Sequence, residues 1–358
     1  MDGLLIIDKP AGPTSHDVVA RMRRALRESR IGHTGTLDPA ATGVLPLVIG
    51  RATRLARFLS ASDKEYEAVV RLGVRTDTWD AEGVPVGHPP TSGSDRGRTR
   101  VRPGSDLGPI PMPSRDAIEA ALDAFRGSFL QQPPTFSAKK IAGQRSYRLA
   151  RANRPRQQIH GVRPQSDPSP TQVGPGSDPS PTAGPATSVT ATAASASVPA
   201  PVSVTVYALT LLTAEADRVV LRVHCSAGFY VRALAHDLGE RLGIGAHLAE
   251  LRRTRVGDYS AADAVTLADA EREPASALRQ LVPLGQLLPG LSSVVLTAEG
   301  VRRATHGRDL GPADMVRTRT SDSASGSIVR LLDGAGDLVG LAEPTPTPGL
   351  LHPSVVLV

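Results

Sequence analysis

The chain of 358 residues is short of cysteine, of aromatic side chains and of long apolar runs. Its single cysteine, Cys225, excludes an intramolecular disulfide framework and offers no set of thiolate metal ligands, so we expect a protein of the reducing cytoplasm. Phe, Trp and Tyr make up only 3% of the sequence, so each tyrosine in a polar motif is a candidate base-stacking residue, although burial is its usual role. No stretch is long enough to span a membrane, and the first residues do not resemble a secretion signal.

Positive charge is in modest excess. Lysine and arginine number 41 against 35 aspartates and glutamates, which gives a formal net charge of +6 and favours an anionic partner such as nucleic acid. The length suffices for two domains. Two segments at about 88–111 and 160–201 are rich in Gly, Pro and Ser, and we interpret them as flexible insertions because they hold too few large apolar residues to offset the entropy of ordering.

The remaining sequence alternates between strand and helix patterns. Apolar runs and period-two alternation predict strands over 4–7, 45–49, 65–72, 202–206, 218–225 and 248–256. Helical spacing predicts helices over 51–59, 115–125, 144–152, 230–242 and most of 265–278, and one that begins with Ser15 as its N-cap. From Leu291 onward the chain is expected to form a small β-rich module with a hairpin of 328–332 and 338–342. These patterns together indicate an α+β protein.

One carboxylate stands out within the sequence GHTGTLDPAATGVLP at 32–46. Asp38 lies among glycines, threonines and prolines, which suit a fixed irregular loop and allow another polymer to approach the backbone closely. A lone Asp-Pro is more often a turn or helix-capping residue with a local role. The other motifs of the chain favour a catalytic loop instead.

Those motifs follow one another in a recognisable order. They are KPAGPTS at 9–15, the 32–46 loop, DKEY at 63–66, RTDT at 75–78 with Asp80, CSAGFYVR at 225–232 and GAHLAELRR at 245–253. In order and approximate spacing they resemble the TruB family of bacterial tRNA pseudouridine-55 synthases. The resemblance covers residues 3 to about 260 apart from the two insertions.

The resemblance implies a fold and a reaction. It implies a mixed central β-sheet in a pseudouridine synthase catalytic domain at 1–285, followed at 291–358 by a small β-rich RNA-binding domain of the PUA type. The implied reaction turns a uridine in the T arm of tRNA, at position 55, into pseudouridine. It implies neither a cofactor nor a metal, and we expect a monomer with no membrane partner.

Breaking the C1′–N1 bond of uridine and rejoining the base through C5 requires a nucleophile or electrostatic partner near the ribose and the base. The resemblance assigns this part to Asp38; attack at C1′, attack at uracil C6 and glycal formation all fit the requirement. A carboxylate in a dry pocket needs a neighbouring cation to stay ionised. The resemblance identifies Arg232 as that cation, and a guanidinium can donate two hydrogen bonds to one carboxylate.

The resemblance also assigns substrate contacts. Tyr66 is expected to stack on the target base and to take part in proton removal, and His33 to fill the space that an extruded nucleotide leaves. Tyr230 and Leu251 are expected to line the same pocket, and Lys9 and Lys64 to lie near a phosphate of the substrate or near the catalytic loop. Without the resemblance, the tyrosines and Leu251 would be ordinary packing residues, His33 a structural histidine and the lysines solvated.

Several alternatives follow from the same residues. Asp77 and Asp80 could suggest a metal site, but two carboxylates are too few ligands, so we expect them to stabilise a turn. The glycines of the loop lack the lysine and serine or threonine of a phosphate cradle, which disfavours a nucleotide cofactor. The alternatives in function are a pseudouridine synthase for another RNA and a noncatalytic protein that binds or folds tRNA.

Overall fold

The computed structural model describes residues 1–86, 111–134, 140–141, 144–145, 199–319 and 328–357. Its contacts separate residues 135–199 from the rest of the chain. Within 135–199 the described elements are the paired strands β8 (Lys140–Ile141) and β9 (Gln144–Arg145). The prediction of a helix over 144–152 is therefore wrong at residues 144–145, which form a strand. The remainder of that helix and nearly all of both predicted insertions lie outside the described residues.

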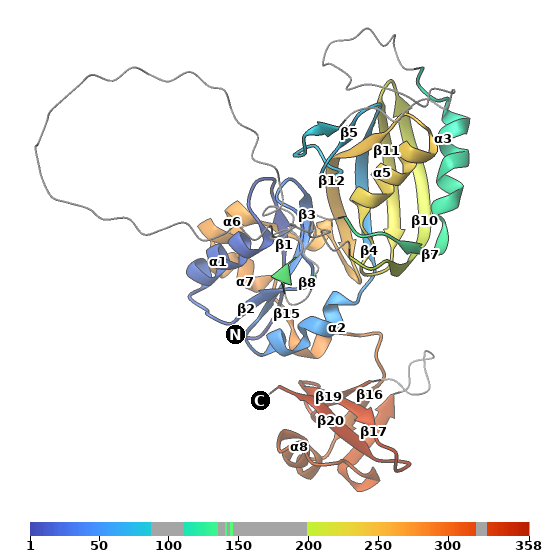
Figure 1. Cartoon of the computed structure of the whole chain (residues 1–358). Helices are drawn as coiled ribbons and strands as arrows, with labels where there is room; N and C mark the ends of the chain where they lie inside the picture. The colour runs from blue at the N-terminus through green and yellow to red at the C-terminus, as the bar shows by residue number, and fades with distance from the viewer. Residues whose placement is uncertain (87–110, 135–139, 142–143, 146–198, 320–327, 358) are drawn as a thin grey trace, which may run out of the picture. The chain divides into compact units, whose positions relative to one another are not determined.

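The larger of the two main sheets is mixed and contains β1 and the strands that pair with it (Figure 1). Its main path runs β14, β1, β3, β12, β4, β11, β10, β7, with β2 on β3, β13 on β12 and β15 on β1. Strands β1 and β14 are parallel, as are β3 and β12, whereas the other pairings are antiparallel. The strands are β1 (Gly3–Lys9), β2 (Ile31–His33), β3 (Thr42–Ile49), β4 (Lys64–Leu72), β7 (Gly127–Gln131), β10 (Val202–Glu215), β11 (Arg218–Cys225), β12 (Ala246–Val256), β13 (Tyr259–Ser260), β14 (Val265–Thr266) and β15 (Val282–Pro283).

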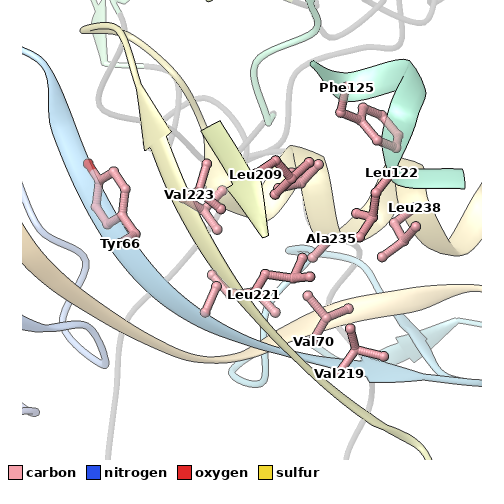
Figure 2. Close-up of a cluster of buried hydrophobic side chains, with 14 of the residues drawn as sticks. Tyr66, Val70, Leu122, Phe125, Leu209, Val219, Leu221, Val223, Ala235 and Leu238 are labelled. Carbon is pink, nitrogen blue, oxygen red and sulfur yellow. The ribbon is translucent and has the colours of Figure 1, made fainter. Parts of the chain in front are cut away.

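Helices pack on this sheet through apolar stripes. They are α1 (Ser15–Leu26), α2 (Ala56–Ser60), α3 (Arg115–Leu122), α5 (Val231–Arg241), α6 (Leu267–Arg272) and α7 (Pro274–Arg279), with short 3-10 turns at Gly50–Leu55, Asp123–Phe125, Ala261–Asp263 and Leu284–Gln286. Leu122 of α3 and Leu238 of α5 pack on Val70, Leu209 and Leu221 of the strands, as Figure 2 shows. Tyr66 of β4 belongs to the same cluster, and its hydroxyl points away from the other labelled side chains.

The start of α1 differs from the prediction. The N-cap is Thr14, whose hydroxyl accepts a hydrogen bond from the Asp17 amide while the Asp17 carboxylate accepts one from the Thr14 amide. Ser15 is the first helical residue and is fully buried. Its hydroxyl instead bonds the backbone of Leu37, accepting from the amide at 2.9 Å and donating to the carbonyl at 3.2 Å. The predicted capping serine therefore ties the helix to the loop of Asp38.

A second sheet, in the order β17, β16, β18, β19, β20, forms the C-terminal region. Its elements are β16 (Ser293–Leu296), α8 (Ala298–Thr305), a 3-10 turn (Pro312–Asp314), β17 (Met315–Arg319), β18 (Val329–Leu332), β19 (Leu338–Pro344) and β20 (Leu351–Val356). Strands β18 and β19 form the predicted antiparallel hairpin. The α+β fold with a mixed central sheet and a separate C-terminal sheet is thus confirmed, whereas the domain limits at 285 and 291 and the PUA-type likeness stay predictions.

Candidate active site

The loop that carries Asp38 connects β2 to β3 and is anchored on both sides of the carboxylate. The Lys9 ammonium donates to the carbonyls of Pro10, Pro39 and Ala41 at 2.9, 3.0 and 2.7 Å. The amide of Gly12 donates to the same Pro39 carbonyl at 2.9 Å. Together with the Ser15 bonds to Leu37, these contacts fix the backbone before and after Asp38.

Two loop glycines have positive φ, and Gly43 has a clear reason for lacking a side chain. Its φ is +102°, and a Cβ there would lie 2.2 Å from the carbonyl oxygen of Arg253. Gly43 pairs with Arg253 where β3 runs parallel to β12. A side chain at this position would force the two strands apart, and the loop would lose its support on the sheet.

Asp38 and Arg232 form the predicted ion pair. The Nε of Arg232 lies 3.1 Å from Oδ2 of Asp38, and its Nη2 donates to Oδ1 at 3.4 Å. Two atoms of the guanidinium thus face two carboxylate oxygens, which fixes the direction of both side chains. The Asp38 side chain is 45% exposed and that of Arg232 is 9% exposed, so the carboxylate stands at the mouth of the site and is wetter than we expected.

Arg232 is the second residue of α5, so the point at which this helix begins determines where Arg232 lies. Gln131, a buried residue at the end of β7, accepts from the Tyr230 amide at 2.8 Å and donates to the Tyr230 carbonyl at 3.0 Å. Tyr230 precedes the first helical residue, Val231. This reciprocal pair fixes where the helix begins, and the next residue is Arg232.

Asp80 is the second carboxylate partner of Arg232, and the sequence interpretation missed this contact. Nη1 of Arg232 lies 3.2 Å from Oδ2 of Asp80 and 3.3 Å from the Thr78 carbonyl oxygen. The other oxygen of Asp80 accepts from the Thr78 hydroxyl at 2.5 Å and from the Glu82 amide at 3.2 Å. Asp80 thus takes part in a turn, as expected, and also joins that turn to α5.

A narrow cavity lies at this cluster. Asp38, Asp80, Arg232 and Leu251 contribute to its wall, together with Ala40, Ala41, Ala81, Glu82, Leu248, Ala249 and Glu250. Three predicted site residues, Asp38, Arg232 and Leu251, therefore meet in one place. Tyr66, Tyr230 and His33 are not part of this wall among the described residues.

Tyr66 lies near Arg253 and Asp38. Its side chain is buried, and the charges of both residues act on its phenol. Burial raises the pKa of Tyr66, an effect that Arg253 partly opposes. Because the phenol is protonated near neutral pH, it can donate a hydrogen bond there but cannot take up a proton as a phenolate.

Arg253 is a further residue that the sequence interpretation did not single out. It is 1% exposed, and it donates to the carbonyls of Val44 at 2.8 Å and Gly35 at 3.1 Å, on either side of the Asp38 loop. It lay within the GAHLAELRR motif, but an arginine two residues after an apolar pocket position carries no separate signal of burial. The Arg253 guanidinium thus holds the loop backbone on both sides of Asp38, and its charge acts on the Tyr66 phenol.

The two lysines were expected near phosphate or the catalytic loop, and Lys9 lies at the loop while the substrate contact stays a prediction. Lys9 is fully buried and Lys64 is 7% exposed, and the Lys64 ammonium donates to the carbonyls of Ser60, at 2.7 Å, and Ser62. The pKa of each lysine is lowered to about 8, mainly by burial and also by the charge of Arg253. In this structure both ammonium groups bond backbone carbonyls, so they support the loops.

His33 ends β2 and is partly buried. The ring of His16, an exposed residue of α1, meets it edge-on with centroids 5.1 Å apart and an interplanar angle of 81°. His33 therefore lies at the entrance of the Asp38 loop beside a second imidazole.

Known structures share this fold. A Cbf5-Nop10-Gar1 complex contains a chain that matches 99% of this one and 85% of its own length, with a TM-score of 0.64 and 25% identity. A chain of an H/ACA RNP bound to a substrate RNA containing 2′-deoxyuridine matches with a TM-score of 0.63, 23% identity and coverage of 99% and 85%.

Family profiles and relatives give the class of the protein. Residues 23–160 match the N-terminal domain of TruB family pseudouridylate synthases, and residues 232–288 match a C-terminal domain of tRNA pseudouridylate synthase B. Proteins named tRNA pseudouridine synthase B are 39% identical in Solibacter usitatus, over the full length of both chains, and 36% identical in Opitutus terrae, over 81% of this chain and 96% of the relative. The protein is accordingly a pseudouridylate synthase, an isomerase. More particularly, the chain belongs to the TruB family.

Proposed function

We propose that the chain isomerises a uridine in the T arm of tRNA, position 55, with Asp38 as the nucleophile that acts on a flipped-out nucleoside. Its membership of the TruB family and the names of its relatives, tRNA pseudouridine synthase B, support a tRNA substrate. The single observation that carries the role of Asp38 is its two-point contact with Arg232 at the mouth of a cavity. We propose that the reaction takes place in the cytoplasm and that the enzyme acts as a monomer.

In this proposal the protein supplies position and charge. Asp38 bonds transiently to the nucleoside and is released again. The C1′–N1 bond of the uridine breaks, the freed uracil turns within the site, and a C1′–C5 bond forms, while C5 loses a proton and N1 gains one. Arg232 keeps the attacking carboxylate oriented, and Leu251 offers an apolar wall to the base. Tyr66 donates a hydrogen bond or stacks on the base, and because its pKa is raised, the final proton goes to another acceptor unless the bound RNA changes its environment.

The cations beneath the loop support the same chemistry. Lys9, Lys64 and Arg253 are buried, the charge of Arg253 acts on both lysines, and the negative charge of Asp38 raises the pKa of Lys9 against the effect of burial. Fixed positive charge in a poorly hydrated region favours a negatively charged group at the loop. We propose that Lys9 and Arg253 hold the loop of Asp38, that Lys64 holds the turn before β4, and that His33 and Tyr230 contact the RNA.

The test of the substrate uses an isolated T-arm stem-loop and a ribosomal RNA fragment of equal length. Each is incubated with the enzyme, and pseudouridine is mapped by carbodiimide adducts that stop reverse transcription. The proposal predicts one modified uridine in the T arm and none in the fragment. Modification of the fragment with none in the T arm would support the alternative of another RNA substrate.

A further inference from the structure

The turn between the short strands β5 (Arg75–Thr76) and β6 (Pro85–Val86) carries Asp80, and one residue in it is unusual. Trp79 has a φ of +66°, in the left-handed region that side chains other than glycine rarely adopt. It is also the single tryptophan of the chain. A bulky residue in this conformation requires surrounding contacts that hold it there.

The backbone of the turn is attached to β12. The Trp79 carbonyl accepts from the Leu248 amide at 3.0 Å, and the Ala81 amide donates to the Leu248 carbonyl at 3.0 Å. Within the turn, the Trp79 amide donates to the Thr76 carbonyl at 3.3 Å and the Thr76 hydroxyl to the Asp80 carbonyl at 2.7 Å. Hydrogen bonds to β12 and to Thr76 thus hold the backbone of the turn at Trp79, the residue with positive φ.

The indole ring of Trp79 stacks on the imidazole of His236. The centroids are 4.3 Å apart and the planes differ by 8°. The buried Nδ1 of His236 has no hydrogen-bond partner among the described residues, so the stack is the contact that orients this side of the ring. Stacked aromatic pairs of this kind contribute packing energy and fix the relative orientation of two elements.

His236 and Arg232 are four residues apart on α5 and lie on one face of it. Arg232 bonds the residues on either side of Trp79, the Thr78 carbonyl and the Asp80 carboxylate. The turn therefore contacts α5 at two positions one helical turn apart, Arg232 and His236. Arg232 in turn holds Asp38.

We propose that the stack of Trp79 on His236 is a positioning device for the isomerisation, which holds the Asp80 turn on α5 and so fixes Arg232 in the orientation that presents Asp38. Trp79 and His236 act through Asp80 and Arg232 and do not touch the reacting atoms. The inference rests on the proposed role of Asp38 but not on the position of the uridine in tRNA.

The test measures single-turnover release of tritium from unmodified tRNA transcripts labelled at uridine C5, which accompanies pseudouridine formation at any position. Trp79→Gly removes the ring while glycine accepts the positive φ, so this variant is expected to fold. We expect a rate about tenfold lower, an unchanged dissociation constant for tRNA and a similar loss for His236→Ala. Trp79→Phe and His236→Phe keep a flat ring and should recover most of the rate.

A double-mutant cycle separates positioning from general stability. In an Asp80→Asn background, Trp79→Gly should lower the rate by less than about twofold, because the residue through which it acts is already changed. The matched control is Arg241→Ala on the same helix, which removes a contact 5.8 Å from the centroid of the Phe125 ring. This control should lower the melting temperature and leave the single-turnover rate unchanged.

Each result bears on the proposal in a defined way. An unchanged rate in Trp79→Gly, an equal loss in the Asp80→Asn background, or weaker tRNA binding with an unchanged rate of the bound complex would overturn it. A wild-type enzyme that releases no tritium from any transcript would instead contradict the proposed substrate. The emission spectrum of Trp79 should also change in His236→Ala, which confirms that the stack exists in solution.

Discussion

Arg232 is the residue on which the site depends, because one guanidinium faces the carboxylates of both Asp38 and Asp80. The three side chains carry a combined charge of −1. Removal of the guanidinium would leave both carboxylates without this shared ion-pair partner, and nothing in the pair would then fix the direction of Asp38. The ion pair is therefore a condition for an oriented Asp38.

At the same scale, Asp80→Asn should lower the single-turnover rate by about 10²-fold with little change in tRNA affinity. The amide can still accept from Thr78 and Glu82 but no longer draws Arg232 by charge, so the angle of the guanidinium toward Asp38 is less well fixed. The control is Asp217→Asn, which removes an ion pair with Arg71 at the sheet surface. Equal rates for the wild type and Asp80→Asn would contradict this account.

The buried Lys9 predicts a dependence of stability on alkaline pH. Its pKa is about 8 in the folded protein against an ordinary value of 10.5, so between these values the unfolded chain binds more protons and unfolding becomes harder as the pH rises. The free energy of unfolding of the wild type minus that of Lys9→Met should therefore increase from pH 8 to pH 10. Urea titrations at both pH values measure it. If the difference in the free energy of unfolding stays constant or falls as the pH rises, the pKa of Lys9 is not lowered in the folded protein.

At the scale of elements, the sequence predicted the central strands and α5 closely. Period-two alternation marks β11 at its observed bounds, and helical spacing places Arg232 and His236 on one face of α5. The Asp38–Arg232 pair followed from the family resemblance, since a separation of 194 residues leaves no local signal. Asp80, Arg253 and Gln131 act through contacts between distant strands and helices, which only the folded chain brings together.

The register of β3 on β12 gives a prediction for the loop glycine. Gly43→Ala combines a positive φ with a Cβ that would meet the Arg253 backbone, and it should destabilise the protein by about 3 kcal/mol or more and lower activity. Gly127→Ala is the matched control, because Gly127 has a φ of +79° but open space around its Cβ position. Gly127→Ala should lower the free energy of unfolding by about 1 kcal/mol. Equal costs in urea unfolding would mean that the close approach at Gly43 is unimportant.

At the scale of the whole molecule, charge decides how the substrate is held. The chain has a formal net charge of +6, and we expect its affinity for a T-arm stem-loop to fall about tenfold or more between 50 and 200 mM salt as counterions are released. Asp38→Asn should show the same slope, since in the proposed reaction Asp38 meets the nucleoside and not a phosphate. Filter binding over a salt series measures this, and a flat dependence would exclude phosphate contacts as the main source of affinity.

In the part of the sequence that the structure describes, no helix combines the length and the apolar character that a membrane crossing requires. The large sheet carries charged side chains in cross-strand pairs, such as Arg222 with Glu67 and Arg255 with Glu65. Pairs of opposite charge on neighbouring strands contribute to the stability of the sheet.

The most direct test of the central claim compares the wild type with Asp38→Asn on the T-arm stem-loop, by single-turnover formation of pseudouridine and by equilibrium binding. Asparagine keeps the size of the side chain and loses its charge and nucleophilicity. We expect binding within about threefold of the wild type and a rate lower by ~10³-fold or more. Pseudouridine formed by Asp38→Asn at the wild-type rate would contradict the assignment of the reaction to this carboxylate.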